Sequence, residues 1–464
     1  MVELPMNPSP VSPLSPATTP LTVPNVDLPN WWQLWRWIQG PLEFQAENRQ
    51  RYGDVFELDF WGLARGVLVG DPVVAEEILS QDFRFDVGRG NLLAEPLLGV
   101  NSLILMDGDR HRRERKLLMP SFHGDRLKTY SHQIRQITLT ALQHWQPGQR
   151  FVARSFMQDI TLEVIIQVIF GLNQGPRYKT LKAILVQWLD LIDSPLRSSI
   201  LFLRVLQVDW GKYSPWGAMR NQRQQIYDLL QAEIEERRSQ DLSQRTDILS
   251  LMMEARDEQG EALSDPELRD EMLTLMFAGH ETTATILAWA IYEIHHNPAI
   301  KDRLHQDLAT VPASTDPLAL IQLPYLKAVS QEVLRKYPVI PSLFPRIPQE
   351  SMVLGGYQFD TSHLIYISGY LLHHREEIYP NPQQFNPDRF LDRTYSPYEY
   401  LPFGGGNRRC LGYALAEMEL RLVLATILQH FELELAESKP VVYQRRGFTL
   451  SPKGGVKMRV LQAL

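Results

Sequence analysis

The sequence predicts a mainly α-helical fold with small β-sheets, and three observations lead to that prediction. Between residues 72 and 310, apolar residues recur mostly at helical spacing, with breaks at prolines. Short apolar alternation, typical of strands, appears at 55–69 as a hairpin, at 352–368 and again after His430. Strands and helices do not alternate regularly, so we do not expect the doubly wound sheet of dinucleotide-binding proteins.

The composition narrows the class of protein further. The 464 residues carry a formal net charge of −7 and 44% of them are hydrophobic, which is typical of a chain with a large core. The mild acidity argues against a nucleic-acid binder, and a single cysteine, Cys410, excludes an internal disulfide. No glycine-rich signature of a nicotinamide, flavin or ATP site is present. With no secretory signal and no apolar stretch of spanning length, we expect a cytoplasmic protein without a transmembrane anchor.

The amino-terminal end differs from the rest of the chain. Residues 1–30 contain eight prolines among Ser, Thr and Asn, a composition typical of a flexible or polyproline-like leader. Residues 31–464 show no linker and no internal repeat, so we expect one domain there. A cluster of tryptophans, amphipathic in character, follows this leader. Because aromatic stripes are more often packed than exposed, we favour a helix that docks its indoles on the domain. The alternative is shallow attachment to a membrane surface. The tryptophans concerned are Trp31, Trp32, Trp35 and Trp37.

A long helix is predicted from Ser264 to His296. A capping box with proline in the first turn gives it a sharp start, and Asn297-Pro298 ends it. Its middle reads AGHETT at 278–283, where a glycine costs about 1 kcal/mol relative to alanine and adjacent threonines can bend a helix. The His280-Glu281 pair is not a zinc-protease motif, because position 284 is Ala where a second histidine is required.

Two other helical segments carry paired charges. Glu332 and Arg335 stand three residues apart within 324–338, which alone predicts an ordinary pair worth about 0.2–0.5 kcal/mol. A basic run surrounds His111 and predicts either a solvated helix face or, beside a functional site, a surface that attracts an acidic partner. The run consists of Arg110, Arg112, Arg113, Arg115 and Lys116.

The most informative segment, 403–412, surrounds the only cysteine and reads FGGGNRRCLG. Three consecutive glycines allow a tight turn and a close approach to a flat group. Helical spacing follows Cys410 directly, so the thiol is predicted at a helix N-terminus, where the dipole, Arg408 and Arg409 favour the thiolate. The alternative is a structural cysteine packed in the core, which would not need so many glycines and arginines around it.

These residues resemble a known family. Phe403, Gly406, Arg408, Cys410 and Gly412 reproduce the F-x-x-G-x-R-x-C-x-G signature of cytochromes P450, and the resemblance covers about residues 40 to 460. It implies the cytochrome P450 fold, with residues 31–464 forming a single haem-thiolate domain. It also implies haem b as the cofactor, with Cys410 as the thiolate ligand of the iron.

The resemblance assigns further contacts to the haem. Phe403 is expected to pack near the sulfur, while Gly404 and the glycines after it offer backbone N–H groups to it. Ala278 would lie over the haem face. Four residues would meet the haem propionates: Arg408, the H-x-x-x-R pair His111 and Arg115, and Arg346.

Catalytic and structural roles follow from the same resemblance. Thr282 would hydrogen-bond the oxygen being activated, and Glu281 would relay protons to it as a general acid. Glu332 and Arg335 match the E-x-x-R pair of the family, which Arg389 completes. The expected role of this ion-pair network is structural.

We therefore expect a soluble, monomeric monooxygenase that inserts one atom of O₂ into an apolar substrate and reduces the other to water. No flavin or iron–sulfur segment is present, so electrons must come from outside, and a ferredoxin-type donor with its reductase is expected. One alternative is a haem-thiolate isomerase or peroxygenase, but such members commonly lose the acid–threonine pair, here Glu281 and Thr282. The other is a haem-based gas or redox sensor, for which 1–30 and 440–464 are too short to hold an output domain.

The substrate is only broadly predicted. The motifs and the segment 194–199 resemble bacterial, especially cyanobacterial, members associated with fatty acids, alkanes and terpenoids. In such enzymes the pocket-lining positions fall at 91–105 and 187–209, which are mostly aliphatic here. Arg197 and Arg204 are candidate partners for a substrate carboxylate. Alternatively, both segments are core faces, and periodicity does not decide between the two.

Overall fold

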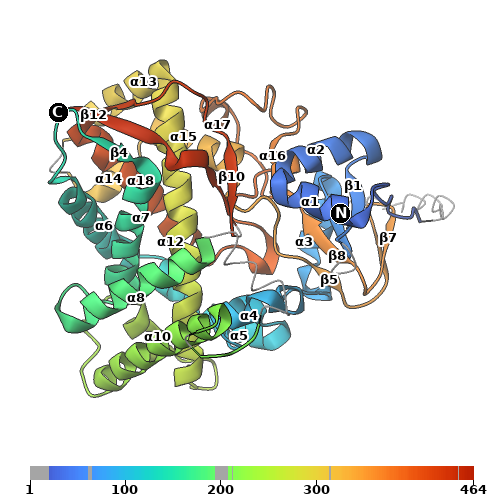
Figure 1. Cartoon of the computed structure of the whole chain (residues 1–464), viewed down its shortest axis with the longest axis horizontal. Helices are drawn as coiled ribbons and strands as arrows, with labels where there is room; N and C mark the ends of the chain where they lie inside the picture. Colours follow the sequence, from blue (N-terminus) through green and yellow to red (C-terminus); the bar gives the residue numbers. More distant parts are fainter. Residues whose placement is uncertain (1–19, 61–64, 194–206, 212, 313–314, 448) are drawn as a thin grey trace, which may run out of the picture.

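The computed structural model describes residues 20–60, 65–193, 207–211, 213–312, 315–447 and 449–464. As predicted, the fold is mainly helical with small sheets (Figure 1). The helices gather around α12, while the amino-terminal helices and the strands beside them form the opposite end of the molecule. The Cys410 loop connects the two regions, because it packs on α3 of the amino-terminal end and leads into α18 of the helical part.

The amino-terminal end is built on a small sheet. Strands β1 (Val55–Asp59) and β2 (Arg65–Val69) form the predicted antiparallel hairpin, and β8 (Leu364–Ile367) joins β2 in parallel. Strands β6 (Met352–Leu354) and β7 (Tyr357–Phe359) form a second hairpin. Helices α2 (Pro41–Tyr52) and α3 (Pro72–Ser80) precede and follow the first hairpin in sequence.

The last part of the proline-rich leader lies along this sheet region. The Leu21 N–H donates to the Gly356 carbonyl at 2.8 Å, and the Val26 N–H donates to the Glu57 carbonyl at 3.0 Å. Both contacts satisfy backbone groups at an otherwise open edge. Residues 1–19 lie outside the described part of the chain.

The tryptophan-rich segment forms α1 (Asn30–Gln39) and docks only in part. Trp37 packs on Phe60, with the ring centroids 5.4 Å apart. Trp32 instead stacks on Trp35 of its own helix at 4.6 Å. Trp31 and Trp35 are 57% and 46% exposed, so the expected docking of the indoles holds for Trp37 and not for these two.

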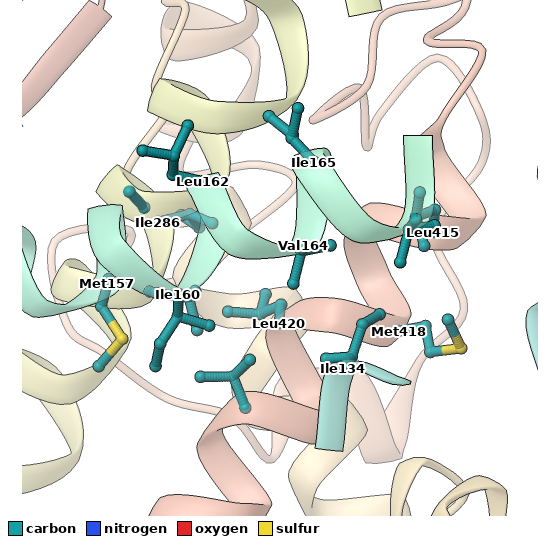
Figure 2. Close-up of a cluster of buried hydrophobic side chains, with 14 of the residues drawn as sticks. Ile134, Met157, Ile160, Leu162, Val164, Ile165, Ile286, Leu415, Met418 and Leu420 are labelled. Carbon is teal, nitrogen blue, oxygen red and sulfur yellow. The ribbon is translucent and has the colours of Figure 1, made fainter. Parts of the chain in front are cut away.

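The main core lies between four helices, α6 (Arg126–Leu142), α7 (Ala153–Val164), α12 (Asp265–His296) and α18 (Tyr413–His430). Figure 2 shows aliphatic side chains from these helices, such as Ile134, Ile160, Ile286 and Leu420, meeting between them. A π-helical turn (Ile165–Ile169) extends α7. The predicted capping box begins α12, since Ser264 and Glu267 each accept a hydrogen bond from the other's backbone.

The remaining helices surround this core. They are α4 (Glu95–Leu98), α5 (Gly108–Leu118), α8 (Gly175–Asp193), α10 (Pro215–Arg238), α11 (Ile248–Glu254), α13 (Pro298–Ala309), α14 (Pro317–Ile321), α15 (Pro324–Lys336), α16 (Gly369–His373) and α17 (Arg389–Asp392). Short 3₁₀ turns lie at Asp82–Arg84, Gly88–Ala94, Leu103–Leu105, Met119–Phe122, Gly406–Arg408 and Lys453–Gly455. No helix in the described ranges combines the length and apolarity needed to cross a bilayer.

The strands predicted after His430 are also present. Strand β12 (Lys457–Ala463) pairs antiparallel with β9 (Phe431–Leu435) and with β4 (Arg150–Val152). Strands β10 (Tyr443–Arg446) and β11 (Thr449–Pro452) form a separate hairpin. A two-residue pair, β3 (Phe85–Asp86) with β5 (Ile347–Pro348), lies beside Arg346, which donates to the Gly405 carbonyl of the cysteine loop.

Candidate active site

The cysteine loop is a tight turn that ends at the thiol. The Cys410 N–H donates to the Phe403 carbonyl at 2.8 Å, which closes the loop. Gly404 and Gly406 adopt φ angles of +69° and +64°, which disfavour residues with a Cβ. A Cβ on Gly406 would also lie 2.6 Å from Asp82 Oδ2. Helix α18 begins at Tyr413, three residues beyond Cys410, so the thiol precedes the helix and does not open it.

The thiol is accessible although protein surrounds it. Cys410 is exposed, yet burial raises its pKa above the ordinary value, and the Gly412 N–H, Arg115 and Arg409 lower it only in part. Both observations fit a thiol that faces an internal space. The sequence predicted that neighbouring cations favour the thiolate, but in the fold the protein alone keeps the pKa of the thiol raised. A bound metal ion would deprotonate the thiol outright.

A second internal surface lies on α12. Residues 283–294 of this helix are buried, but Ala278 is exposed, and Gly279 and Thr282 are partly exposed. Ala278 and Thr282 are one helical turn apart and share a face. The Thr282 hydroxyl donates to the Ala278 carbonyl at 2.5 Å. An exposed alanine in the middle of a long buried helix marks a face that borders internal space.

Three guanidinium groups and one imidazole gather between these surfaces and α5. Arg408 donates to Asp107 at 2.8 Å and to the Leu103 carbonyl at 3.2 Å. Arg346 donates to Asp82 at 3.1 Å and to the Gly405 carbonyl at 3.2 Å. His111 is buried, and within the described ranges nothing accepts a hydrogen bond from its neighbour Arg115.

Burial and the neighbouring cations destabilise the charged forms of His111 and Arg408. Burial first, and then Arg408 and Arg115, lower the pKa of His111 to about 3, so this imidazole is neutral at physiological pH. Burial also lowers the pKa of Arg408 to about 10; Asp107 and Asp82 oppose this shift in part, and Arg346 and Arg115 add to it. Cations that destabilise one another need anions nearby. A cofactor with two carboxylates would supply them, and Arg115 has donors available to bind one.

Two aspartates outside the sequence motifs, Asp82 and Asp107, hold this arrangement together. Asp82 accepts from Arg346 and from the Asn407 N–H at 2.8 Å, so it ties a propionate candidate to the cysteine loop. Asp107 accepts from Arg408 and from the backbone N–H groups of Val87 and Gly88. No local pattern identifies either residue, because their partners lie up to 325 residues away.

The Glu281 carboxylate is held by contacts to α7 and to Thr285 of its own helix. The Glu281 carboxylate lies against α7, where it accepts from Arg154 Nη2 at 2.5 Å and from Gln158 Nε2 at 3.0 Å. The preceding His280 is buried, and its Nε2 lies 3.1 Å from the Gln158 carbonyl. Among the described residues no group of three or more His, Cys, Asp or Glu side chains could hold a metal ion.

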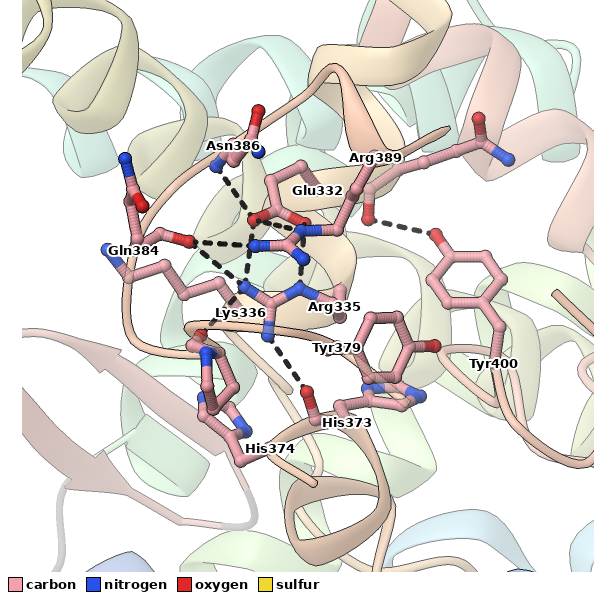
Figure 3. Close-up of polar contacts among 12 residues, drawn as sticks. Glu332, Arg335, Lys336, His373, His374, Tyr379, Gln384, Asn386, Arg389 and Tyr400 are labelled. Carbon is pink, nitrogen blue, oxygen red and sulfur yellow. Dashed lines mark hydrogen bonds and ion pairs between the residues drawn. The ribbon is translucent and has the colours of Figure 1, made fainter. Parts of the chain in front are cut away.

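The E-x-x-R pair is a buried ion network, shown in Figure 3. Glu332 and Arg335 are both fully buried and form two hydrogen bonds, at 2.7 and 2.8 Å. Arg389 adds a contact to Glu332 at 3.2 Å. Arg335 also donates to the carbonyl of His373, whose Nε2 accepts from the Leu401 N–H. The network thus connects α15 to the segment that precedes the cysteine.

A basic cavity opens beside α5. It has a volume of about 600 Å³ and reaches Asn407 of the cysteine loop. Arg112 and Lys116 are each 72% exposed at their side chains. The lining comprises His111, Arg112, Arg115, Lys116, Met119, Pro120, His123 and Asn407. Three members of the basic run, Arg112, Arg115 and Lys116, therefore line a cavity that reaches the cysteine loop.

Together these features define a class of protein. An accessible thiol on a glycine-rich loop and a small-residue face on a long helix fit the two sides of a flat metal-bearing cofactor. The cations fit its carboxylates. Haem has this shape and charge, and thiolate ligation of its iron is established chemistry for proteins. The site is that of a haem-thiolate enzyme.

Comparisons with known proteins give the family. The family model described as Cytochrome P450 matches residues 24–457. The chain is 33% identical over 421 residues to a protein carried under the name cytochrome P450 135B1 of Mycobacterium tuberculosis, covering 90% of this chain and 87% of that one. It is 32% identical over 407 residues to cytochrome P450 138 of Mycobacterium bovis, covering 88% of each. This chain belongs to the cytochrome P450 family.

The fold is shared with solved members of the family. The structure of the cyanobacterial CYP120A1 with bound retinoic acid superimposes with a TM-score of 0.82, covering 96% of this chain and all of that one at 23% sequence identity. The predicted fold, the haem cofactor and the monooxygenase class are thus confirmed. As a P450 monooxygenase the protein uses O₂, an apolar substrate and an external source of electrons.

Proposed function

We propose that this monooxygenase oxidises a long apolar molecule: a fatty acid, an alkane or a terpenoid. The observation that carries the proposal is the aliphatic segment 91–105, which borders the haem site. Arg408 donates to the Leu103 and Met106 carbonyls, and the Leu103 N–H donates to Glu271 of α12 at 2.6 Å. The segment therefore bridges the cysteine loop and the helix with the exposed inner face.

Side chains near this bridge are apolar. Ile104 and Leu105 are half-buried, as are Leu275 and Phe277 of α12, next to the exposed Ala278. Apolar walls favour a ligand that gains about 0.8 kcal/mol for each buried methylene. The structural likeness to a protein that binds retinoic acid, an apolar terpenoid acid, agrees with this class. Segment 194–206, with Arg197 and Arg204, lies outside the described residues.

The test is a set of spectral titrations of the haem-loaded enzyme. Acids, alcohols and alkanes of increasing length should shift the haem toward high spin, with affinity rising with length until the cavity is filled. Tighter binding of the acids alone would indicate a cationic anchor, while equal length dependence in all three series would indicate apolar burial alone. A spin shift with small polar compounds and none with lipids or terpenes would reject this substrate class.

Thr282 and Glu281 are proposed to deliver protons at the exposed face of α12. Haem, when bound, supplies the activation of O₂ at its iron. Thr282 donates its own proton to Ala278, so its oxygen remains able to accept a hydrogen bond at that face. Glu281 is paired with Arg154, so it must release this guanidinium before it can pass a proton toward Thr282. We assign that release as the gate of proton delivery.

The electron donor is proposed to be an acidic ferredoxin, with its reductase, that docks at the basic cavity. Arg112 and Lys116 border the cavity that reaches the cysteine loop; both are exposed, and they pair at the surface with Asp109 and Glu258. A positive surface there would steer a negative partner toward the thiolate side of the haem and raise its association rate. The expected salt dependence is steep, because exposed charges are screened within about 10 Å at 0.1 M salt.

We propose a monomer in the cytoplasm that contacts membranes shallowly through α1. Trp31, Trp35 and Ile38 are about half-exposed and stand at helical spacing on one face. Tryptophans on such a face suit the lipid headgroup region. Flotation with phospholipid vesicles should recover the wild type, and a variant with Trp31→Ser and Trp35→Ser should stay in solution. Equal flotation of both would reject this contact.

A further inference from the structure

We propose that Trp289 and Tyr337 form a redox relay that carries oxidising equivalents away from the haem site to the surface. The relay would give the enzyme a second activity: the one-electron oxidation of surface reductants at the expense of peroxide. The proposal rests on the haem-thiolate assignment and does not depend on the proposed substrate class.

The relay starts on the helix that borders the site. Trp289 follows Thr282 by seven residues on α12, which places it two turns further along and on nearly the same face. Its indole is fully buried and stacks on the Tyr337 ring, with centroids 4.0 Å apart and planes inclined by 12°. Face-to-face contact at this distance brings the π-systems of two oxidisable side chains together.

Further aromatic rings extend the contact to the surface. Tyr292 lies 6.0 Å from Trp289 and stacks on His296 at 5.2 Å. His296 is exposed at the end of α12. Tyr443 lies 5.2 Å from Trp289 on the other side. The ring contacts therefore run from Trp289 through Tyr292 to the exposed His296, and Tyr292 is the last oxidisable ring on this path.

A proton acceptor is already in place beside Tyr337. The phenol donates a short hydrogen bond to Glu293 Oε1, and Lys336 donates to the same oxygen at 2.7 Å. Glu293 is 2% exposed, and a buried carboxylate is costly unless it is paired. Burial first, and then Glu293, raise the pKa of Tyr337, so the phenol keeps its proton until it is oxidised.

Tyr337 loses one electron to the oxidised haem site through Trp289, and its phenolic proton passes to Glu293. The tyrosyl radical then regains an electron from a surface reductant, such as ascorbate, and its proton returns from Glu293, while the oxidised reductant releases its own proton to solvent. With hydrogen peroxide as the oxidant, two such cycles supply two electrons, and these together with two protons from solvent reduce one H₂O₂ to two molecules of water.

The test uses the haem-loaded enzyme with hydrogen peroxide and no substrate. Freeze-quenched samples should show a tyrosyl radical by electron paramagnetic resonance, and Tyr337→Phe and Trp289→Phe should each lose most of it. Both variants should also bleach their haem faster and oxidise ascorbate more slowly. The matched control is Tyr130→Phe, since Tyr130 is also buried but donates to backbone carbonyls.

Two outcomes would overturn the relay. One is a Tyr337→Phe enzyme with the radical yield and bleaching rate of the wild type. The other is a loss of thermal stability in Tyr337→Phe and Glu293→Gln with an unchanged radical, which would make the cluster a structural tie only. An intact thiolate spectrum of the reduced carbonyl complex in each variant shows that the haem site is preserved, so this test is separate from that of the site.

Discussion

Replacing Glu332 by Gln should destabilise the fold by several kcal/mol. The carboxylate accepts two hydrogen bonds from Arg335, a third from Arg389 at 3.2 Å and a fourth from the Asn386 N–H at 2.9 Å. Glutamine keeps one acceptor oxygen but leaves two buried guanidiniums without their counter-charge. Removing one partner of a buried pair costs about 3–5 kcal/mol, and we expect a loss of that size in the free energy of unfolding.

The assay is denaturant unfolding of the haem-loaded enzyme, followed by fluorescence and circular dichroism with coincident transitions. The matched control is Glu437→Gln, because Glu437 pairs with Lys457 and both side chains are more than half-exposed. An exposed pair is worth about 0–1 kcal/mol. A Glu332→Gln enzyme that unfolds within about 1 kcal/mol of the wild type would refute the reasoning. If that variant fails to accumulate, Arg389→Gln should show a smaller loss.

Three further predictions concern the site. Asp82→Asn should weaken haem retention by about 10- to 100-fold, since charge-assisted hydrogen bonds contribute about 1.5–3 kcal/mol; haem transfer to apomyoglobin measures it, and wild-type retention would contradict it. Thr282→Ala should divert reducing equivalents to hydrogen peroxide without loss of haem, whereas Thr138→Ala, which removes a similar bond to a carbonyl on α6, should not; unchanged coupling would reject the role of Thr282. Lys116→Glu should slow reduction by an acidic ferredoxin in a salt-dependent way, while Lys457→Glu should not; equal rates would locate the docking surface elsewhere.

The sequence predicts those parts of the site whose interacting residues lie close together in one motif. Ser264 and Glu267 predict the start of α12 because both partners of a capping box lie within one turn. The loop ending at Cys410 is predictable because its glycines stand next to the thiol. The basic run on α5 indicates a charged face, but only the fold places Lys116 at the cavity that reaches Asn407.

Contacts that depend on tertiary packing could not be predicted. Glu281 and Arg154 are 127 residues apart in the sequence and form an ion pair between two helices. The local sequence pattern of neither helix predicts this pair. The thiol of Cys410 was expected to ionise on the strength of neighbouring cations, but its pKa is raised because burial outweighs them. Likewise, the spacing of the α1 tryptophans indicates an amphipathic helix, not which indole packs on Phe60.

The most direct test of the haem-thiolate assignment is the absorption spectrum of the reduced carbonyl complex. The purified wild type should contain one haem and show the strongly red-shifted Soret band of a thiolate ligand. Cys410→Ala should lose that band, because Cys410 is the only cysteine in the chain. A Cys410→Ala protein that retains the red-shifted band would contradict the account.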